Sequence, residues 1–257
     1  MFVSLISGSS GNASVISDGK TKLLVDCGMS GKKLSEALSQ LELACTELSC
    51  VLLTHEHIDH SRGIGVLARR YHLPIYATQG TINALTVGEI PDSLLHPIKP
   101  GSDFSIGEIG ILPFPILHDA ADPVGYRFHT RVGRYAIATD TGEISEEIFS
   151  AISGCGSVLL ESNHDIDMLM YGSYPYQLKK RILGRLGHLS NIAASETAVR
   201  LLESGTKKLL LGHLSKENNT PEIAYATVKN ALTSAGAKLS EDISLGVAGR
   251  YEITRLD

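Results

Sequence analysis

The stretch that constrains this chain most reads HEHIDH at residues 55–60, directly behind the apolar run CVLL at 50–53. It gathers three imidazoles and two carboxylates. If the chain leaves a buried strand in an extended conformation, His55 and His57 point to the same side, because side chains alternate with period two. If it then turns into a helix near Asp59, Asp59 and His60 diverge from the first pair. The stretch therefore predicts a pair of divalent metal ions.

The donor types in this stretch indicate which metals it can hold. Neutral imidazole nitrogens suit zinc and other first-row metals, and a carboxylate also accommodates manganese or iron. We therefore expect two divalent ions, with zinc as the leading candidate and manganese as the alternative. A polar loop with capping carboxylates is the other interpretation, but this spacing behind an apolar strand favours ligands.

Short motifs along essentially the whole chain accompany the metal stretch. They read SGSSGN at 7–12, DTG at 140–142, ESNH at 161–164, GHLSN at 187–191 and GHLS at 212–215. Together they resemble the metallo-β-lactamase-fold hydrolases, and within that superfamily the WalJ/YycJ-type exonuclease-like proteins, near ribonuclease Z and PhnP. The resemblance implies an α/β protein with the αββα sandwich of the metallo-β-lactamase fold.

The order of apolar runs agrees with such a sandwich. In the first part we expect strands at 2–6, 13–17, 22–26, 50–54 and 74–78, and helices at 32–41, 62–71 and 80–85. Successive strand-like runs from 103 to 139 predict a second, antiparallel sheet. Further on we expect helices at 144–152, 176–183, 191–203 and 221–235, and strands at 157–160, 209–212 and 243–253. No linker divides residues 1–257, so we expect one domain.

Composition limits the partners and the compartment. A net charge of −5 argues against indiscriminate coating of nucleic acid, although two bound ions would add about four positive charges at the site. The four cysteines show no CxxC pattern and are typical of buried thiols in a reducing compartment. No signal peptide and no run of the ~18 apolar residues of a membrane span is evident. We expect a cytoplasmic protein without membrane association.

Three other apolar runs end in a polar residue, and such positions gather along one edge of a sandwich. They end at His118, Asp140 and His213, and together these residues complete the ligand set that the resemblance implies. Asp140 should bridge both ions, because the two oxygens of a carboxylate can bind separate metals. The predicted first set is His55, His57 and His118, and the predicted second set is Asp59, His60 and His213. Asp59 is thereby also a candidate catalytic residue.

His188 stands just ahead of a capped helix. The resemblance to ribonuclease Z and PhnP implies that this histidine approaches the scissile phosphate, with Glu161 supporting it. We predict that Glu161 keeps the His188 imidazole charged, so that it can stabilise phosphoryl charge or donate a proton to the leaving oxygen. For His164 both a site-facing role and a loop hydrogen bond are open, and we count it as a candidate substrate-binding residue.

Two segments are further candidates for substrate contact. The loop 8–12 is either a tight turn or a cradle of backbone N–H groups for phosphate. The segment before His188 carries Lys179, Lys180, Arg181 and Arg185 without an acid, and Arg181 and Arg185 are four apart, as on one helix face. We predict that these four cations contact backbone phosphates, against the alternative of an ordinary solvated helix.

The resemblance implies a metal-dependent phosphodiesterase that acts on nucleic acid, with a DNA exonuclease as the leading hypothesis. A thioesterase or lactonase of the glyoxalase II kind is the main alternative. Redox chemistry of the flavodiiron type is disfavoured, because that branch has a glutamate at the position of His57 and adds a flavodoxin domain. A non-catalytic binding protein is disfavoured by the complete ligand set. The segment between Asp140 and His213 is too short for a β-CASP domain, which departs from the ribonuclease J pattern.

Overall fold

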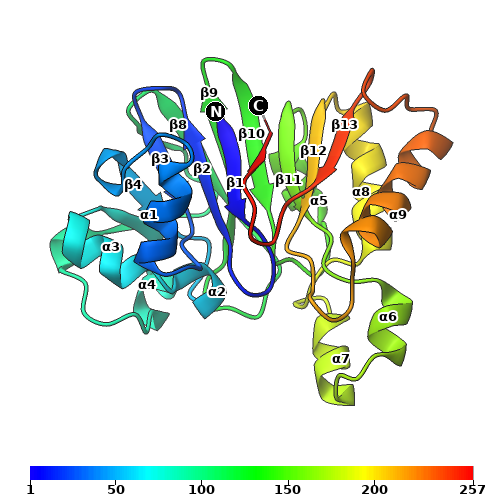
Figure 1. Cartoon of the computed structure of the whole chain (residues 1–257), viewed down its shortest axis with the longest axis horizontal. Helices are drawn as coiled ribbons and strands as arrows, with labels where there is room; N and C mark the ends of the chain where they lie inside the picture. The colour runs from blue at the N-terminus through cyan, green and yellow to red at the C-terminus, as the bar shows by residue number, and fades with distance from the viewer. Residues whose placement is uncertain (257) are drawn as a thin grey trace.

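Two seven-stranded β sheets lie face to face in this protein, and helices cover the outer side of each sheet (Figure 1). The structure, a computed structural model, describes residues 1–256. This α/β sandwich confirms the fold that the order of the apolar runs predicts.

The first sheet takes six of its seven strands from the N-terminal part of the chain, in the order β14-β1-β2-β3-β4-β5-β6. The strands are β1 (Phe2–Ile6), β2 (Ala13–Ser17), β3 (Lys22–Val25), β4 (Cys50–Leu52), β5 (Ile75–Thr78), β6 (Leu95–Ile98) and β14 (Thr254–Arg255). The helical segments of this half are α1 (Gly31–Ser39), η1 (Cys45–Glu47), α2 (Ile58–Ser61), α3 (Ile64–Tyr71), α4 (Gln79–Ala84) and η2 (Asp92–Leu94). Pairing is parallel from β3 through β6.

The second sheet has the order β13-β12-β11-β10-β9-β8-β7. Its strands are β7 (Phe104–Ile106), β8 (Ile109–Pro115), β9 (Val124–Thr130), β10 (Gly133–Ala138), β11 (Ser157–Glu161), β12 (Lys208–Gly212) and β13 (Ser244–Val247). Its helices are α5 (Glu146–Ile152), α6 (Ile166–Tyr171), α7 (Tyr176–Ile182), α8 (Asn191–Glu203) and α9 (Pro221–Ser234). β7 to β10 pair antiparallel, and β10 to β13 pair parallel, so the carboxyl ends of the latter meet at one edge.

Three apolar layers hold the sandwich together. Phe2, Tyr126 and Phe128 are fully buried between the sheets. Leu34 of α1 packs on the outer face of the first sheet, and Leu201 of α8 packs on the outer face of the second. Burial of a side chain of this size contributes about 1.5–3 kcal/mol, so these layers give the strand ends a rigid base.

Side-chain caps fix where many of the helices begin. A Ser, Thr or Asp accepts a hydrogen bond from the backbone N–H three residues further on, which satisfies one otherwise unpaired donor. The capping residues are Ser30, Thr78, Ser145, Asp165, Ser190 and Thr220. Ser190 bears directly on the site, because it starts α8 two residues after His188.

The structure differs from the sequence-based expectations at several elements. Of the predicted strand 243–253 only Ser244–Val247 forms a strand, β13, because the chain then leaves the second sheet, and the Gly249 carbonyl accepts the Ser7 N–H at 3.1 Å. The chain joins the other sheet only after this range, at β14. β6 and α6 were not expected, since short segments carry too little periodicity to be recognised. α7 ends at Ile182 and Arg185 lies beyond it, so the expectation that Arg181 and Arg185 share a helix face is wrong.

The cysteines behave as the sequence predicts. All four are free and buried. Burial raises the pKa of the Cys27 thiol to about 12, which makes it a poor nucleophile. Within residues 1–256, no helix combines the length and the apolar character that a membrane span requires.

Candidate metal centre

Strand ends bring the predicted donors to one edge of the sandwich. His55 follows β4, His118 follows β8, Asp140 follows β10 and His213 follows β12. Asp140 and His213 have left-handed backbone angles, with φ of 59° and 52°. Such a conformation costs a non-glycine residue roughly 1–3 kcal/mol and is typical of functional sites. The fold therefore maintains backbone strain at the two positions that direct these side chains into the site.

The first donor group contains His55, His57 and His118, whose ligating atoms all lie within 4.8 Å of one another. Nδ1 of His55 lies 3.0 Å from the hydroxyl of Thr54, and Nδ1 of His118 lies 3.2 Å from the carbonyl oxygen of Gly187. A carbonyl oxygen can only accept a hydrogen bond, so Nδ1 of His118 carries the proton. Its Nε2 therefore keeps a lone pair. Nε2 of His118 lies 3.3 Å from Nδ1 of His57.

The second donor group contains Asp59, His60, Asp140 and His213, again within 4.8 Å. The short helix α2 begins at Ile58, directly after His57, so Asp59 and His60 leave the direction of the first pair. The predicted turn into a helix near Asp59 is therefore confirmed. The side chain of Asp59 is about one-fifth exposed, whereas those of His60 and His213 are buried, so Asp59 is the donor of this group on the solvent side.

Asp140 lies between the two groups. Its Oδ1 is 3.9 Å from Nε2 of His118, while its Oδ2 is 3.2 Å from Nε2 of His60 and 3.1 Å from Nδ1 of His213. One oxygen therefore faces each group, which is the arrangement that a bridging carboxylate needs. Burial opposes its charge, yet His213 and His60 hold the pKa of Asp140 well below its usual range.

Asp26, at the end of β3, supports the second group, and the sequence analysis missed it. Its Oδ1 accepts the Thr54 N–H at 2.8 Å, and its Oδ2 accepts from the Thr54 hydroxyl at 2.9 Å and from Nδ1 of His60 at 2.8 Å. This bond places the proton of His60 on Nδ1 and leaves Nε2 with its lone pair, as in a ligand histidine supported by a carboxylate. The signal was present, because Asp26 ends an apolar strand as Asp140 does.

The residues in place fit a metal. Nε2 of His55, Oδ2 of Asp140 and Nδ1 of His213 are buried without a hydrogen-bond partner among the described residues, and the last two do not meet in hydrogen-bond geometry although they lie 3.1 Å apart. Such orphaned buried atoms are costly unless something binds them. Burial lowers the pKa of His55 and of His118, which keeps their lone pairs available. Neutral imidazoles and carboxylates are ligands for divalent metals.

His188 and Glu161 form a pair beside the donors. Nδ1 of His188 lies 2.7 Å from Oε1 of Glu161, and Oε2 of Glu161 accepts the Thr141 N–H at 2.8 Å and the Leu189 N–H at 3.3 Å. Glu161 is fully buried. Burial works against a charged imidazole, yet the Glu161 carboxylate raises the pKa of His188 to about 9. The predicted contact between these two residues is present. The same carboxylate also binds the backbone of Thr141, next to Asp140, and of Leu189, next to His188.

A cleft of about 160 Å³ opens next to His188. Its apolar side is formed by Tyr174, Leu178 and Ile182 from the α7 region, and its polar side includes Ser9 of the loop 8–12. His188 connects this cleft with the donors, because it belongs to one group with Asp140 and His213, and 19% of its side chain is accessible.

The basic segment borders this cleft, but most of its charge has internal partners. Arg181 binds Asp119, with Nη2 3.1 Å from Oδ1, and Nε of Arg185 donates to Glu143 at 2.7 Å. Nζ of Lys179 donates to the carbonyl oxygens of Met170 and Gly172, at 2.8 Å each. Of the four predicted cations, only Lys180 has no such bond within residues 1–256. Their contact with phosphate stays a prediction.

His164 is buried in the structure. It is 1% exposed, and neither ring nitrogen has a hydrogen-bond partner among the described residues. Burial lowers its pKa to about 4, so the imidazole is neutral. A backbone bridge joins His164 to Ser190, just ahead of α8, and contact of the buried ring with a substrate stays a prediction.

The loop 8–12 lies against the second donor group and is more than a tight turn. The Asn12 side chain receives the Gly8 N–H at 3.0 Å, and its Nδ2 lies 3.0 Å from Nε2 of His60. The Asn12 N–H donates to the Asp59 carbonyl at 2.8 Å, and its carbonyl receives the Gly28 N–H at 2.8 Å. A Cβ at Gly28 would overlap the Asp59 carbonyl oxygen, so only glycine allows this approach.

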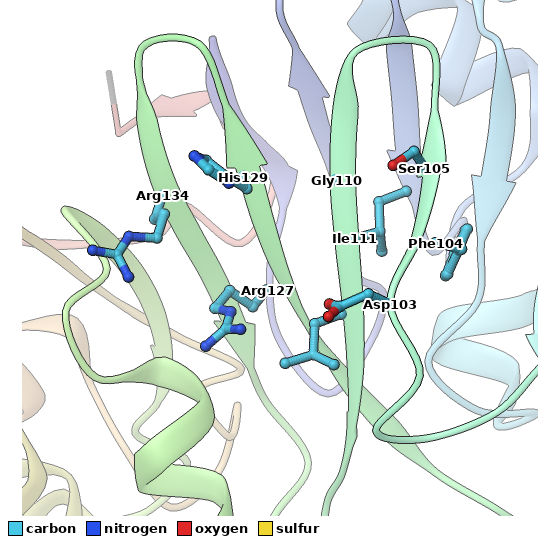
Figure 2. Close-up of a pocket in the computed structure, with 9 residues that line it drawn as sticks. Asp103, Phe104, Ser105, Gly110, Ile111, Arg127, His129 and Arg134 are labelled. Atoms are coloured by element: carbon cyan, nitrogen blue, oxygen red, sulfur yellow. The ribbon is translucent and has the colours of Figure 1, made fainter.

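Another hollow, of about 470 Å³, lies on the outer face of the antiparallel part of the second sheet (Figure 2). Its lining includes Arg127 and His129 of β9 and Arg134 of β10 on one side, and Asp103 on the other. None of the predicted metal donors lines it. The chemistry of the candidate centre therefore belongs to the strand-end edge and not to this face.

Comparison with known proteins gives the same family. The beta-lactamase superfamily domain matches residues 21–214. The exodeoxyribonuclease WalJ of Streptococcus pneumoniae is 41% identical over 247 residues, which cover 95% of this chain and 90% of that protein. The exodeoxyribonuclease YycJ of Bacillus anthracis is 40% identical over 242 residues, which cover 93% of this chain and 92% of that protein.

A solved structure supports the fold independently. The metallo-beta-lactamase fold protein YhfI from Bacillus subtilis superposes with a TM-score of 0.72 at 19% identity, over 98% of both chains. At this identity the similarity concerns the arrangement of strands and helices. It agrees with the two facing sheets described above.

Proposed function

This chain belongs to the beta-lactamase superfamily, and on that premise we propose that it is a metal-dependent exodeoxyribonuclease. The observation that carries the proposal is the 40–41% identity, over more than nine-tenths of both chains, to two proteins named exodeoxyribonuclease. The clustered imidazoles and carboxylates at the strand ends supply the chemistry that such an activity needs. A thioesterase or lactonase is not favoured, because neither of these relatives carries such a name.

Two divalent ions, zinc foremost and manganese as the alternative, belong to this proposal. His55, His57 and His118 would hold the first, Asp59, His60 and His213 would hold the second, and Asp140 would supply an oxygen to each. When bound, such a pair lowers the pKa of water toward neutrality and neutralises phosphoryl charge in an in-line displacement. Zinc is favoured because imidazole nitrogens dominate the donor set.

The chain's own residues then supply acid–base help. Glu161 fixes Nδ1 of His188 at 2.7 Å, which orients the ring and favours its charged form. A charged imidazole at the cleft can donate a proton to the leaving oxygen or offset phosphoryl charge, a contribution of typically 10²–10⁴-fold in rate. Asp26 plays a positioning role, since it acts only through Thr54 and His60.

Substrate binding extends to the basic segment. Lys180 offers a charge without a partner among residues 1–256, whereas Lys179, Arg181 and Arg185 share theirs with groups of the protein. We assign these four cations to backbone phosphates, with Lys180 the strongest candidate. Contacts of this kind are insensitive to sequence and weaken with salt.

A substrate panel tests the proposal. The metal-loaded protein is given 5′-labelled and 3′-labelled DNA, the same sequences as RNA, bis-p-nitrophenyl phosphate and a thioester. We expect stepwise shortening of DNA from one end together with hydrolysis of the small phosphodiester. Hydrolysis of the thioester alone would overturn the assignment, and equal cleavage of RNA would change the substrate class.

A further inference from the structure

A groove of about 360 Å³ borders the loop 8–12, between α1 and the segment 250–253. Buried apolar residues, among them Leu5, Met29 and Ala37, form part of its wall. Lys33, Arg62 and Tyr251 also line it, and all three are exposed. The groove therefore combines an apolar surface with cations and an aromatic ring.

The cations of this groove have no acidic partners. Within residues 1–256, no carboxylate lies in ion-pair distance of Lys33 or Arg62. Glu36 is the one acid among the lining residues, and Nζ of Lys32 lies 3.9 Å from it. The two charges are consequently available to an external anion, unlike those of Arg181 and Arg185, which carboxylates already pair.

More positive charge surrounds Tyr251. The side chain of Ser10 and the charges of Arg250, Lys216 and Lys33 lower the pKa of the Tyr251 phenol. Nη2 of Arg250 donates to the Leu214 carbonyl at 2.8 Å, while its buried Nη1 has no hydrogen-bond partner among the described residues. Three cations therefore act on the Tyr251 ring, although the whole chain carries a net charge of −5.

Tyr251 is suited to hold an unpaired base. Tyr251 is 68% exposed, and no other aromatic ring of the described residues packs against its ring. Stacking of a base on an exposed aromatic side chain among cations is the usual way in which proteins bind single-stranded nucleic acid. A duplex hides its base faces, so this arrangement favours a single strand.

One short loop lies between the groove and the cleft beside His188. Ser9 lines the cleft beside His188, and Ser10, the next residue, lines this groove. Asn12 of the same loop contacts His60 at 3.0 Å. A chain molecule at the cleft has only to cross this loop to reach the groove.

We propose that the groove binds single-stranded DNA on the far side of the loop 8–12 from the scissile phosphate, with Lys33 and Arg62 on backbone phosphates and Tyr251 stacked on a base. This inference rests on the proposed nuclease function and adds where the uncleaved part of the polymer lies. A substrate too short to cross the loop gains nothing from the groove.

The test compares a long and a short substrate on the metal-loaded enzyme. We measure binding of a phosphorothioate single strand, which resists cleavage, as a function of salt for the wild type and for Lys33→Gln with Arg62→Gln. We expect the slope of log K against log salt to become shallower by up to about 1.4, from two lost contacts of about 0.7 each. Hydrolysis of a dinucleotide should keep its rate.

Two further variants sharpen this result. Lys229→Gln with Lys238→Gln removes the same charge from α9 and the turn after it, on the other side of the molecule (Figure 1), and should leave the slope unchanged. Tyr251→Ala should weaken binding of the single strand roughly 5- to 150-fold, the range of one lost base stack. Tyr251→Phe keeps the ring and should restore it.

Each outcome is decisive. The proposal is wrong if the salt slope of the Lys33 and Arg62 variant is unchanged, or if the control pair changes the slope equally. Equal loss on the dinucleotide and on the long strand also overturns it, because the variants then disturb the centre itself. A shift seen with duplex alone rejects the single strand as occupant. A wild type that cleaves no DNA instead refutes the proposed function, independently of the slopes.

Discussion

Asp26→Asn is a perturbation whose effect can be worked out from distances. In the native protein Oδ2 of Asp26 receives the proton on Nδ1 of His60 at 2.8 Å, and Oδ1 receives the Thr54 N–H at 2.8 Å. Asparagine can keep an oxygen on Thr54, but its amide then points N–H groups at the N–H of His60. The imidazole must lose that bond or move its proton to Nε2, which removes the lone pair for the second metal.

The expected loss is about 10–100-fold in the affinity of the second metal, the usual effect of removing a supporting carboxylate, or about 1.4–2.7 kcal/mol. The affinity of the first metal should change less, because Asp26 is connected to that group only through the Thr54 hydroxyl, which lies 3.0 Å from Nδ1 of His55. The assay is competition against a chromophoric chelator, which yields two successive dissociation constants. The metal-free variant should also be less stable by about 1–3 kcal/mol, from the unsatisfied buried donor.

A matched control is available at the surface. Asp18 likewise accepts backbone N–H groups, from Lys20 at 3.0 Å and Thr21 at 2.8 Å, but in a turn far from the donors along the chain. Asp18→Asn should leave both constants as they are. If Asp26→Asn does the same, the reasoning from Asp26 through His60 to the metal is refuted.

Three other perturbations follow from the same structure. His188→Ala should retain its bound metal and lose about 10²–10⁴-fold in rate; loss of metal in elemental analysis would instead make His188 a ligand. Gly28→Ala should lower the melting temperature and the metal content together, because the new Cβ overlaps the Asp59 carbonyl oxygen; normal metal content would contradict this. Arg181→Gln with Arg185→Gln should shallow the salt slope on duplex DNA by up to about two, and an unchanged slope would return these arginines to a purely structural role.

The sequence predicts those parts of the site where several donor residues lie close together in the chain. Residues 55–60 place four donors behind one strand, so alternation and a helix start suffice to separate them into two groups. His118, Asp140 and His213 required one more step, because single polar residues at strand ends are common. The same step applied to 22–26 would have found Asp26, whose role depends on the short distance to His60 that only the fold creates.

The parts that could not be predicted depend on tertiary packing. His164 lies in a motif beside Glu161, and the local sequence does not show that its ring is buried. Arg185 follows Arg181 at helical spacing, but α7 ends at Ile182. A Cβ at Gly187 would also meet the Ile182 carbonyl oxygen, so the chain doubles back before His188. The carboxylates of Asp119 and Glu143 that pair with these arginines come from distant segments.

The central claim is that the strand ends hold two divalent ions with Asp140 between them. Elemental analysis of protein purified without chelator, then remetallated with zinc or manganese and freed of excess metal, tests it most directly. The geometry predicts close to two equivalents per chain. Fewer than one equivalent after remetallation with either metal would contradict the claim.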